Sequence, residues 1–143
     1  MTGTPCLVDT AVLAYAVGAD HPLRAGCRRI VEAAGAGDLE LHASVEMVQE
    51  FVFHRMRRGD RRTAIKQARD VAALCVLHDF DRAVLQTALD LIADLDDIGG
   101  RDAVHAATAL RHGLSTIISP DRAFDDIPGL HRVDPGGPID SVR

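Results

Sequence analysis

Short apolar runs alternate with longer segments of helical periodicity along this chain, and two of the runs lie just before acidic residues. Residues 5–8 form a run that stops at Asp9, and residues 115–118 form another that is separated from Asp121 by two residues. Runs of this length are typical of buried strands. Strands that alternate with helices pair in parallel, because each crossover helix returns the chain to the same end of the sheet. The pattern predicts an α/β sandwich.

The segments between these runs carry residues that begin and end helices. Ser44 and Asp60 are predicted N-caps, because their side chains can accept hydrogen bonds from the first turn of a helix. The glycines at residues 35–37 are predicted to end the preceding helix. We therefore expect helices that begin near Thr10, Pro22, Ser44, Asp60 and Val84, a helix over residues 102–112, and further strands at residues 39–42, 76–77 and 130–133.

Length and composition limit what these elements can build. A chain of 143 residues is long enough for one domain with a real core, and neither a repeat nor a linker divides it. Aromatic residues make up only 3% of the chain, so the core is aliphatic. A surface that stacks nucleic-acid bases on aromatic platforms is hard to build from this set. We expect a single domain over residues 1–143.

The cysteines and the apolar segments bear on where the protein works. Cys6, Cys27 and Cys75 are odd in number and lack CxxC spacing, so they indicate neither a disulfide framework nor a zinc knuckle. The N-terminus lacks the pattern of a signal peptide, and no stretch approaches the roughly 18 to 20 apolar residues that span a bilayer. We expect a cytoplasmic protein without a membrane partner.

Four acids stand at positions from which their side chains can meet. In an open parallel sheet, ligands collect beyond the carboxyl ends of the strands. Asp9 and Asp121 follow two predicted strands there, and Asp102 begins a helix after two glycines. Glu50 lies in mid-helix between apolar neighbours. Together the four predict an acidic pocket.

Each acid also has a simpler explanation when it is taken alone. Asp102 is an acid in the first turn of a helix, which the helix dipole favours. Asp121 is equally an ordinary turn residue, and Glu50 a solvated helix acid. Asp9 is harder to explain away, because a buried and unpaired carboxylate is costly. The argument for a site therefore depends on the four together.

The sequence contexts of the four acids carry a family resemblance. They are Leu7-Val8-Asp9-Thr10, Val48-Gln49-Glu50-Phe51, residues 102–109 (DAVHAATA) and residues 117–124 (IISPDRAF). In this order, over about four-fifths of the chain, they resemble PIN domains, especially the toxin nucleases of bacterial toxin–antitoxin pairs. The resemblance implies a PIN-like three-layer sandwich with a central, mostly parallel sheet flanked by helices.

The same resemblance implies a metal-dependent endoribonuclease that leaves a 5′-phosphate and a 3′-hydroxyl. It makes Asp9, Glu50, Asp102 and Asp121 the catalytic residues, with Asp9, Asp102 and Asp121 holding Mg²⁺ or Mn²⁺. Clustered carboxylates raise one another's pKa, and a hard divalent cation with oxygen ligands removes that repulsion. The implied partners are an RNA substrate, a cognate antitoxin and a second copy in a homodimer.

Two departures from the family pattern concern the neighbours of these acids. Pro120 stands where many relatives have Thr or Ser, which puts the orientation of Ser119 in question. Glu46 lies one helical turn before Glu50, so either acid can serve the site, although the context favours Glu50. Asp125 is expected to be solvated or to take part outside the ligand set.

Other polar residues near the motifs have open roles. Thr10 and Ser119 can hydrogen-bond a carboxylate or merely cap. His105 lies one turn beyond Asp102, and a packed core histidine explains it better than a metal ligand. The five arginines within residues 55–62 follow the Glu50 helix, so they either guide an RNA backbone or form a solvated helix end.

Two other functions remain compatible with the sequence. One is an RNA-processing PIN nuclease without an antitoxin. The other is a degenerate PIN scaffold that only binds a partner, and the presence of all four acids weighs against it. A net charge of −5 argues mildly against a protein that simply coats nucleic acid.

Overall fold

The computed structural model describes residues 3–142, whose strands form one sheet. The strand order is β3-β2-β1-β4-β5, and each neighbouring pair is parallel. The expected parallel sheet is therefore confirmed. The strands are β1 (Thr4–Val8), β2 (Leu39–Ser44), β3 (Val76–His78), β4 (Thr116–Ile118) and β5 (His131–Val133).

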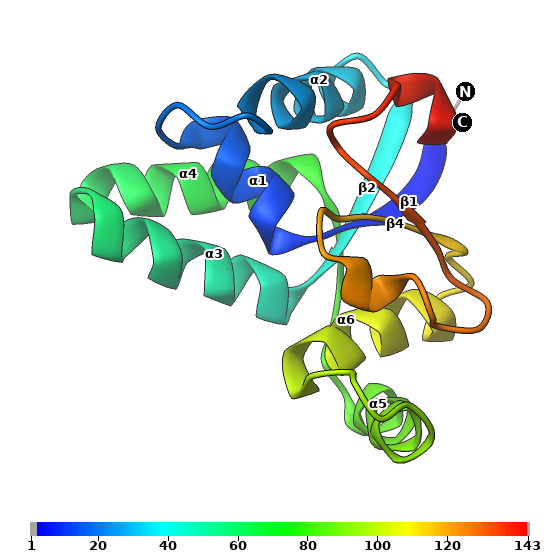
Figure 1. The fold of residues 1–143 in the computed structure, drawn as a ribbon. Coiled ribbons are helices and arrows are strands. Elements are labelled where there is room, and N and C mark those ends of the chain that lie inside the picture. The colour runs from blue at the N-terminus through cyan, green and yellow to red at the C-terminus, as the bar shows by residue number, and fades with distance from the viewer. Residues whose placement is uncertain (1–2, 143) are drawn as a thin grey trace.

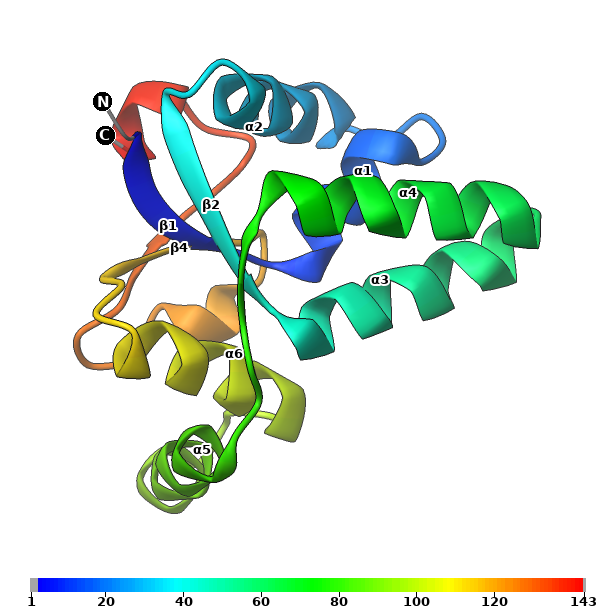
Figure 2. The same cartoon turned by 180° about the vertical axis from the view of Figure 1, so that it is seen from behind.

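Helices cover both faces of this sheet and extend beyond one end of it. Figure 1 shows α1 and α2 on one face and α6, with α5 outside it, on the other. The view from behind shows α3 and α4 side by side, projecting away from the sheet (Figure 2). The helices are α1 (Thr10–Val17), α2 (Arg24–Gly35), α3 (Val45–Arg58), α4 (Arg61–Leu74), α5 (Arg82–Asp94) and α6 (Gly100–Arg111).

The predicted helix ends are supported by specific hydrogen bonds. Ser44 accepts a hydrogen bond from the Met47 backbone N–H at 3.1 Å, and Asp60 accepts one from the Thr63 N–H at 2.9 Å. Both are therefore the N-caps that the sequence predicted. Gly37, whose φ is 85°, turns the chain from α2 into β2, because glycine adopts this left-handed conformation without a Cβ clash.

The register between β1 and β4 determines where the first acids lie. Leu7 pairs with Ile117, and Val8 pairs with Ile118. The Asp9 backbone N–H then donates to the Ile118 carbonyl at 3.0 Å, so the two strands end level with each other. Residues that directly follow these strands are thereby placed next to one another at the carboxyl edge of the sheet.

The core is aliphatic, as the composition predicts. Leu7, Leu41 and Ile117 are almost fully buried on the central strands, and Phe51 and Phe124 are the aromatic side chains among the largest fully buried ones. The three cysteines are buried and free. In the part of the chain that the structure describes, no helix is long and apolar enough to cross a membrane.

Three segments differ from the elements that the sequence predicted. The helix expected over residues 102–112 begins at Gly100 and ends at Arg111, so Asp102 lies in its first turn. Residues after β5, for which the sequence predicted no helix or strand, pack back onto the protein, and Val142 is buried in the core. A short turn of 3-10 helix, Arg122–Phe124, also follows Asp121, whose side chain caps it.

Candidate active site

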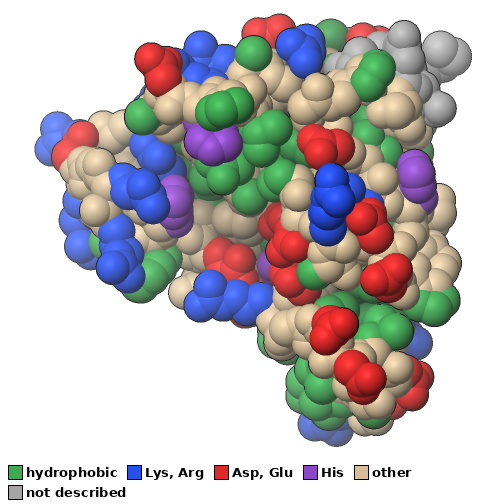
Figure 3. All heavy atoms as spheres, viewed as in Figure 1, with side chains coloured by type: hydrophobic (Ala, Val, Ile, Leu, Met, Phe, Trp, Pro, Cys, Tyr) green, Lys and Arg blue, Asp and Glu red, His purple; other side chains and the backbone are tan. Residues whose placement is uncertain are grey.

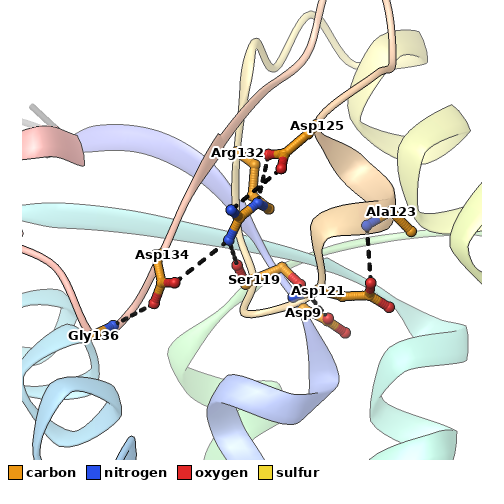
Figure 4. A network of polar contacts seen from close by, with 8 residues as sticks. All are labelled: Asp9, Ser119, Asp121, Ala123, Asp125, Arg132, Asp134 and Gly136. Atoms are coloured by element: carbon orange, nitrogen blue, oxygen red, sulfur yellow. Dashed lines mark hydrogen bonds and ion pairs between the residues drawn. The ribbon is translucent and has the colours of Figure 1, made fainter.

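Half of the site is built on the ends of β1 and β4. Ser119 is fully buried, and its hydroxyl donates to Asp9 Oδ2 at 2.6 Å. The same hydroxyl oxygen accepts a hydrogen bond from the Asp121 N–H at 3.0 Å. Asp121 in turn accepts from the Ala123 N–H at 2.9 Å (Figure 4). One serine therefore joins the two strand-end acids, and Pro120 does not prevent this contact.

Arg132 on β5 holds the turn that carries Ser119, and the sequence alone did not indicate this residue. Its guanidinium donates to the Ser119 backbone carbonyl at 3.1 Å. It also makes a two-pronged contact with Asp125, at 2.6 Å and 3.4 Å, and lies 3.6 Å from Asp134 (Figure 4). Asp125 is therefore the partner of an arginine outside the acidic pocket. Hydrogen bonds to Arg132 lower the pKa of Asp125.

The other half of the site is built on helices, and it holds Glu50 on α3. Thr10, the first residue of α1, donates to Glu50 Oε2 at 3.3 Å, and His105 Nε2 of α6 lies 3.5 Å from the same oxygen. These contacts and the charge of Arg101 lower the pKa of Glu50, with the His105 contact contributing most. Thr10 and His105 therefore favour the ionised form of this carboxylate.

His105 is a buried residue that contacts the site. Its side chain is only 3% exposed, which agrees with the packed histidine that the sequence favoured. Its Nδ1 atom has no hydrogen-bond partner within residues 3–142. The histidine therefore turns its other ring nitrogen toward Glu50 while the rest of the ring packs in the core.

Asp102 has the opposite electrostatic environment. Its pKa is raised, first by burial and then by the negative charges of Asp121, Asp9 and Glu50. Each of the other predicted acids is therefore near enough to Asp102 to affect its ionisation. Glu46, the alternative to Glu50, is partly buried in the first turn of α3.

The donor set suits a hard cation, because these acids offer only carboxylate oxygens. After burial, the charges of the other acids raise the pKa of Asp102, and a bound cation would offset that repulsion. Across residues 3–142, however, no three His, Cys, Asp or Glu side chains lie close enough to form a finished metal site. The carboxylates influence one another across the pocket rather than converging on one point.

A groove of about 1260 Å³ begins at Glu50 and Thr10 and runs between α1 and α3. Arg55, Arg57 and Arg58 line it from α3, and Arg101 lines it from α6. Figure 3 shows basic side chains gathered over the projecting end of the molecule and acidic ones over the opposite side.

The predicted arginine run is thus divided between two surfaces. Arg61 and Arg62 belong to α4 and line a separate shallow hollow with Ile65, Lys66, Arg69 and Asp70. The division arises at Gly59, where α3 ends and the chain reverses into α4. Of the arginines in this run, the three on α3 line the groove with Glu50, and Arg61 and Arg62 do not.

Comparison with known proteins identifies the family to which this fold and these acids belong. The model of the PIN domain matches residues 6–130. The chain belongs to the PIN-domain family. Ribonuclease VapC7 of Mycobacterium tuberculosis is 35% identical over 131 residues, which cover 90% of each chain. Ribonuclease VapC13 of the same organism is 33% identical over 129 residues, which cover 89% of this chain and 98% of that protein.

A solved structure has the same architecture. A toxin–antitoxin complex from Klebsiella pneumoniae matches with a TM-score of 0.70 and 18% identity, over 91% of this chain and 97% of its own. The PIN family and the α/β sandwich that the sequence predicted are both confirmed.

Proposed function

We propose that this PIN-domain protein is a metal-dependent endoribonuclease and the toxin of a toxin–antitoxin pair. The observation that carries the proposal is the placing of the acids, since the Ser119 hydroxyl joins Asp9 and Asp121 where β1 and β4 end level with each other. Burial, followed by the charges of these and the remaining acid, raises the pKa of Asp102 beside them. A fold that gathers like charges at the carboxyl edge of its sheet is built to receive a cation. The relatives named VapC ribonucleases support RNA as the substrate.

Asp9, Asp102 and Asp121 are the residues that we assign to hold Mg²⁺ or Mn²⁺. When bound, the cation supplies charge that offsets the negative charge developing on the scissile phosphate and lowers the pKa of water. Ser119 orients Asp9 for this task through the 2.6 Å hydrogen bond. Arg132 holds the Ser119 carbonyl and so keeps the turn that carries Asp121 in place.

Glu50 is the residue that we assign to accept the proton of the attacking water. Its pKa is lowered, so it is ionised at neutral pH and can orient the water or accept its proton. Thr10 and His105 hold one of its carboxylate oxygens and thereby orient the other. The arginines of the groove neutralise the RNA backbone as it approaches the acids.

The partner in this proposal is an antitoxin with a flexible apolar tail. The groove between α1 and α3 offers a place for the tail, and its acidic end suits a basic side chain. An arginine pairs with carboxylates through two hydrogen bonds, so it would compete with the cation. Inhibition should therefore weaken as the magnesium concentration rises.

A homodimer completes the proposed assembly. Leu85, Leu89 and Ile92 are 42–50% exposed and lie at helical spacing on one face of α5. An apolar stripe on one helix can pack against its own copy about a two-fold axis. Leu89→Asp should then convert the dimer to a monomer in a light-scattering measurement of molar mass. Unchanged molar mass would remove α5 from the interface.

The decisive experiment maps RNA ends after incubation with the purified protein and Mg²⁺. We expect internal cleavage that leaves a 5′-phosphate, stops in excess EDTA and returns with Mg²⁺ or Mn²⁺. The matched control is Asp102→Asn, which should fold and not cleave. A wild-type protein that cleaves equally well in EDTA contradicts the metal mechanism. A folded wild-type protein that cleaves no RNA identifies a partner-binding scaffold instead.

A further inference from the structure

One side of α3 carries several different chemical groups in a row along the groove. Glu50, Phe53, His54, Arg57 and Arg58 all line it, and each lies three or four residues from at least one other. This spacing places them on one helix face. Seven residues of helix separate Glu50 from Arg57, which corresponds to about 10 Å along the axis. A carboxylate, an aromatic ring and a pair of cations therefore follow one another in that order.

The aromatic residue of this row, Phe53, is exposed, whereas an aromatic ring that belongs to the core is buried. Phe53 is 56% exposed, whereas Phe51, two positions earlier on the same helix, is fully buried. The Arg57 guanidinium lies 5.6 Å from the centre of the Phe53 ring. The ring thus lies at the groove surface, and no core contact explains its presence there.

A second aromatic pair lines the same groove from its other wall. Tyr15 of α1 stacks on His21 with ring centres 4.1 Å apart and planes at 18°. Both residues line the groove with Phe53. A chain with only one tyrosine and four phenylalanines therefore places two of these five rings here. The aromatic platform that the composition seemed to exclude is concentrated at one place.

We propose that the groove binds the nucleotides beside the scissile phosphate as a single strand, with a base stacked on Phe53 and the next phosphates on Arg57 and Arg58. This inference rests on the proposed function and specifies how its substrate is held. Bases present a flat face to a ring whatever their identity, and unpaired RNA exposes such faces. The alternation of ring and cation along α3 matches the alternation of base and phosphate along a strand.

The apolar tail proposed for the antitoxin matches the α1 wall of the groove, which Ala11, Ala14 and Val17 line, whereas this row on α3 fits RNA better. An apolar peptide needs a continuous apolar floor, but the Phe53 ring has His54, Arg57 and Arg58 as its groove-lining neighbours on α3. These neighbours favour a ligand that carries negative charge at short intervals. At the acidic end of the groove, the negative charge of RNA is tolerated only beside a cation that offsets the carboxylates. We place the scissile phosphate at that point.

The test measures strand binding in an Asp102→Asn background, so that no RNA is cleaved during the measurement. The probes are a labelled single-stranded RNA of randomised sequence and an abasic ribose-phosphate strand of the same length. Phe53→Leu removes the ring face and keeps an apolar side chain, and Phe53→Tyr keeps the face. Phe80→Leu is the matched control, because Phe80 is 37% exposed and is not among the residues that line the groove.

We expect the parent to bind the RNA more tightly than the abasic strand. Phe53→Leu should weaken RNA binding roughly tenfold and remove the preference over the abasic strand, because a stacked base contributes at about this level. Phe53→Tyr should restore the preference, and Phe80→Leu should leave it unchanged. In the cleaving protein, Phe53→Leu should raise KM with kcat nearly unchanged.

Any one of several results would overturn the inference. RNA preference that survives in Phe53→Leu, or equal weakening for both strands, shows that no base stacks on the ring. Loss of antitoxin binding with RNA binding unchanged assigns the ring to the protein partner. If the Phe53 variant behaves like wild type in a protein that cleaves RNA, only the stacking inference fails. If the wild-type protein neither binds nor cleaves RNA, the proposed function fails with it.

Discussion

The two halves of the acidic pocket hold their carboxylates in different ways. On the strand half, hydrogen bonds tie Asp9 and Asp121 to Ser119 and to the backbone. On the helix half, Asp102 has a raised pKa, and the pKa of Glu50 is lowered by His105 and Thr10. The strand half therefore holds Asp9 and Asp121 in position. The helix half instead gives its two acids different pKa values, raised for Asp102 and lowered for Glu50.

In the proposed mechanism, the strand half supplies the metal ligands Asp9 and Asp121, and the helix half supplies the third ligand, Asp102, together with Glu50. Strand ends are rigid, so they suit ligands whose geometry matters. On the helix half, Glu50 has Thr10 and His105 as partners, whereas Asp102 is buried near other negative charges. Glu50 is thereby kept ionised, and Asp102 gains most from a cation.

The largest effect is expected from Asp102→Asn. Loss of this carboxylate should lower cleavage about a thousandfold or more, since a bound cation supplies several kcal/mol of charge stabilisation. Without metal, the same variant should melt at a higher temperature than wild type near neutral pH. A raised pKa means that ionised Asp102 destabilises the folded state, and this cost appears as the pH rises from the ordinary Asp pKa through the raised one.

Thermal melts in EDTA across this pH range check that prediction. The advantage of the asparagine variant should vanish at pH values below the ordinary Asp pKa, where both side chains are neutral. A variant that melts below wild type at neutral pH in EDTA would show that Asp102 has a stabilising partner, and the proposed contrast between the halves would be lost.

Glu50→Gln should lower cleavage about 10²- to 10⁴-fold, as expected for the loss of a general base, and leave Mn²⁺ binding nearly intact. Its stability effect should have the opposite sign to that of Asp102→Asn. A lowered pKa means that ionised Glu50 stabilises the folded state above its ordinary pKa, and this contribution fades as the pH falls through the lowered one. Melts at neutral and acidic pH in EDTA measure the difference. A gain in stability at neutral pH would refute it.

Ser119→Ala tests the strand half. The variant loses the hydrogen bond to Asp9 and the acceptor for the Asp121 N–H, so both acids lose orientation. We expect the Mg²⁺ concentration for half-maximal cleavage to rise roughly 10- to 100-fold, as for other residues that orient metal ligands. Ser119→Thr keeps the hydroxyl and serves as the rescue variant. An unchanged metal requirement would mean that Asp9 is oriented without Ser119.

Arg132→Met should have the smallest effect, a few-fold rise in the same Mg²⁺ requirement, because it acts on the acids only through Ser119. Arg132→Lys keeps the charge but loses the two-pronged contact with Asp125, so it should rescue only in part. Arg111→Met, at an exposed position in the last turn of α6, is the control. Equal effects of the Arg111 and Arg132 variants would exclude a positioning role.

Much of this arrangement could be predicted from local sequence patterns. Asp9 and Asp121 follow apolar runs whose parallel pairing puts them at one edge, and Ser44 and Asp60 are caps that act within a few residues. Such features depend on short stretches of chain. The catalytic assignment of the acids itself remains a prediction that the variants above test.

Long-range contacts could not be predicted in the same way. Arg132 meets Ser119 only because β5 pairs with β4, and nothing near residue 132 in the sequence marks it. From the sequence, the arginines of residues 55–62 have one joint role, either as a guide for RNA or as a solvated helix end, but the turn at Gly59 directs them to two different surfaces. Composition likewise gives the number of aromatic rings. It does not predict that Tyr15 and Phe53 line the same groove.

The central claim is that the strand half and the helix half share a divalent cation. Calorimetric titration of Mn²⁺ into the wild-type protein, Asp9→Asn and Asp102→Asn tests it most directly. The claim predicts saturable binding to wild type that is lost in each single variant, because one acid comes from each half. Wild-type affinity in Asp102→Asn, or the absence of Mn²⁺ binding to the folded wild-type protein, would contradict it.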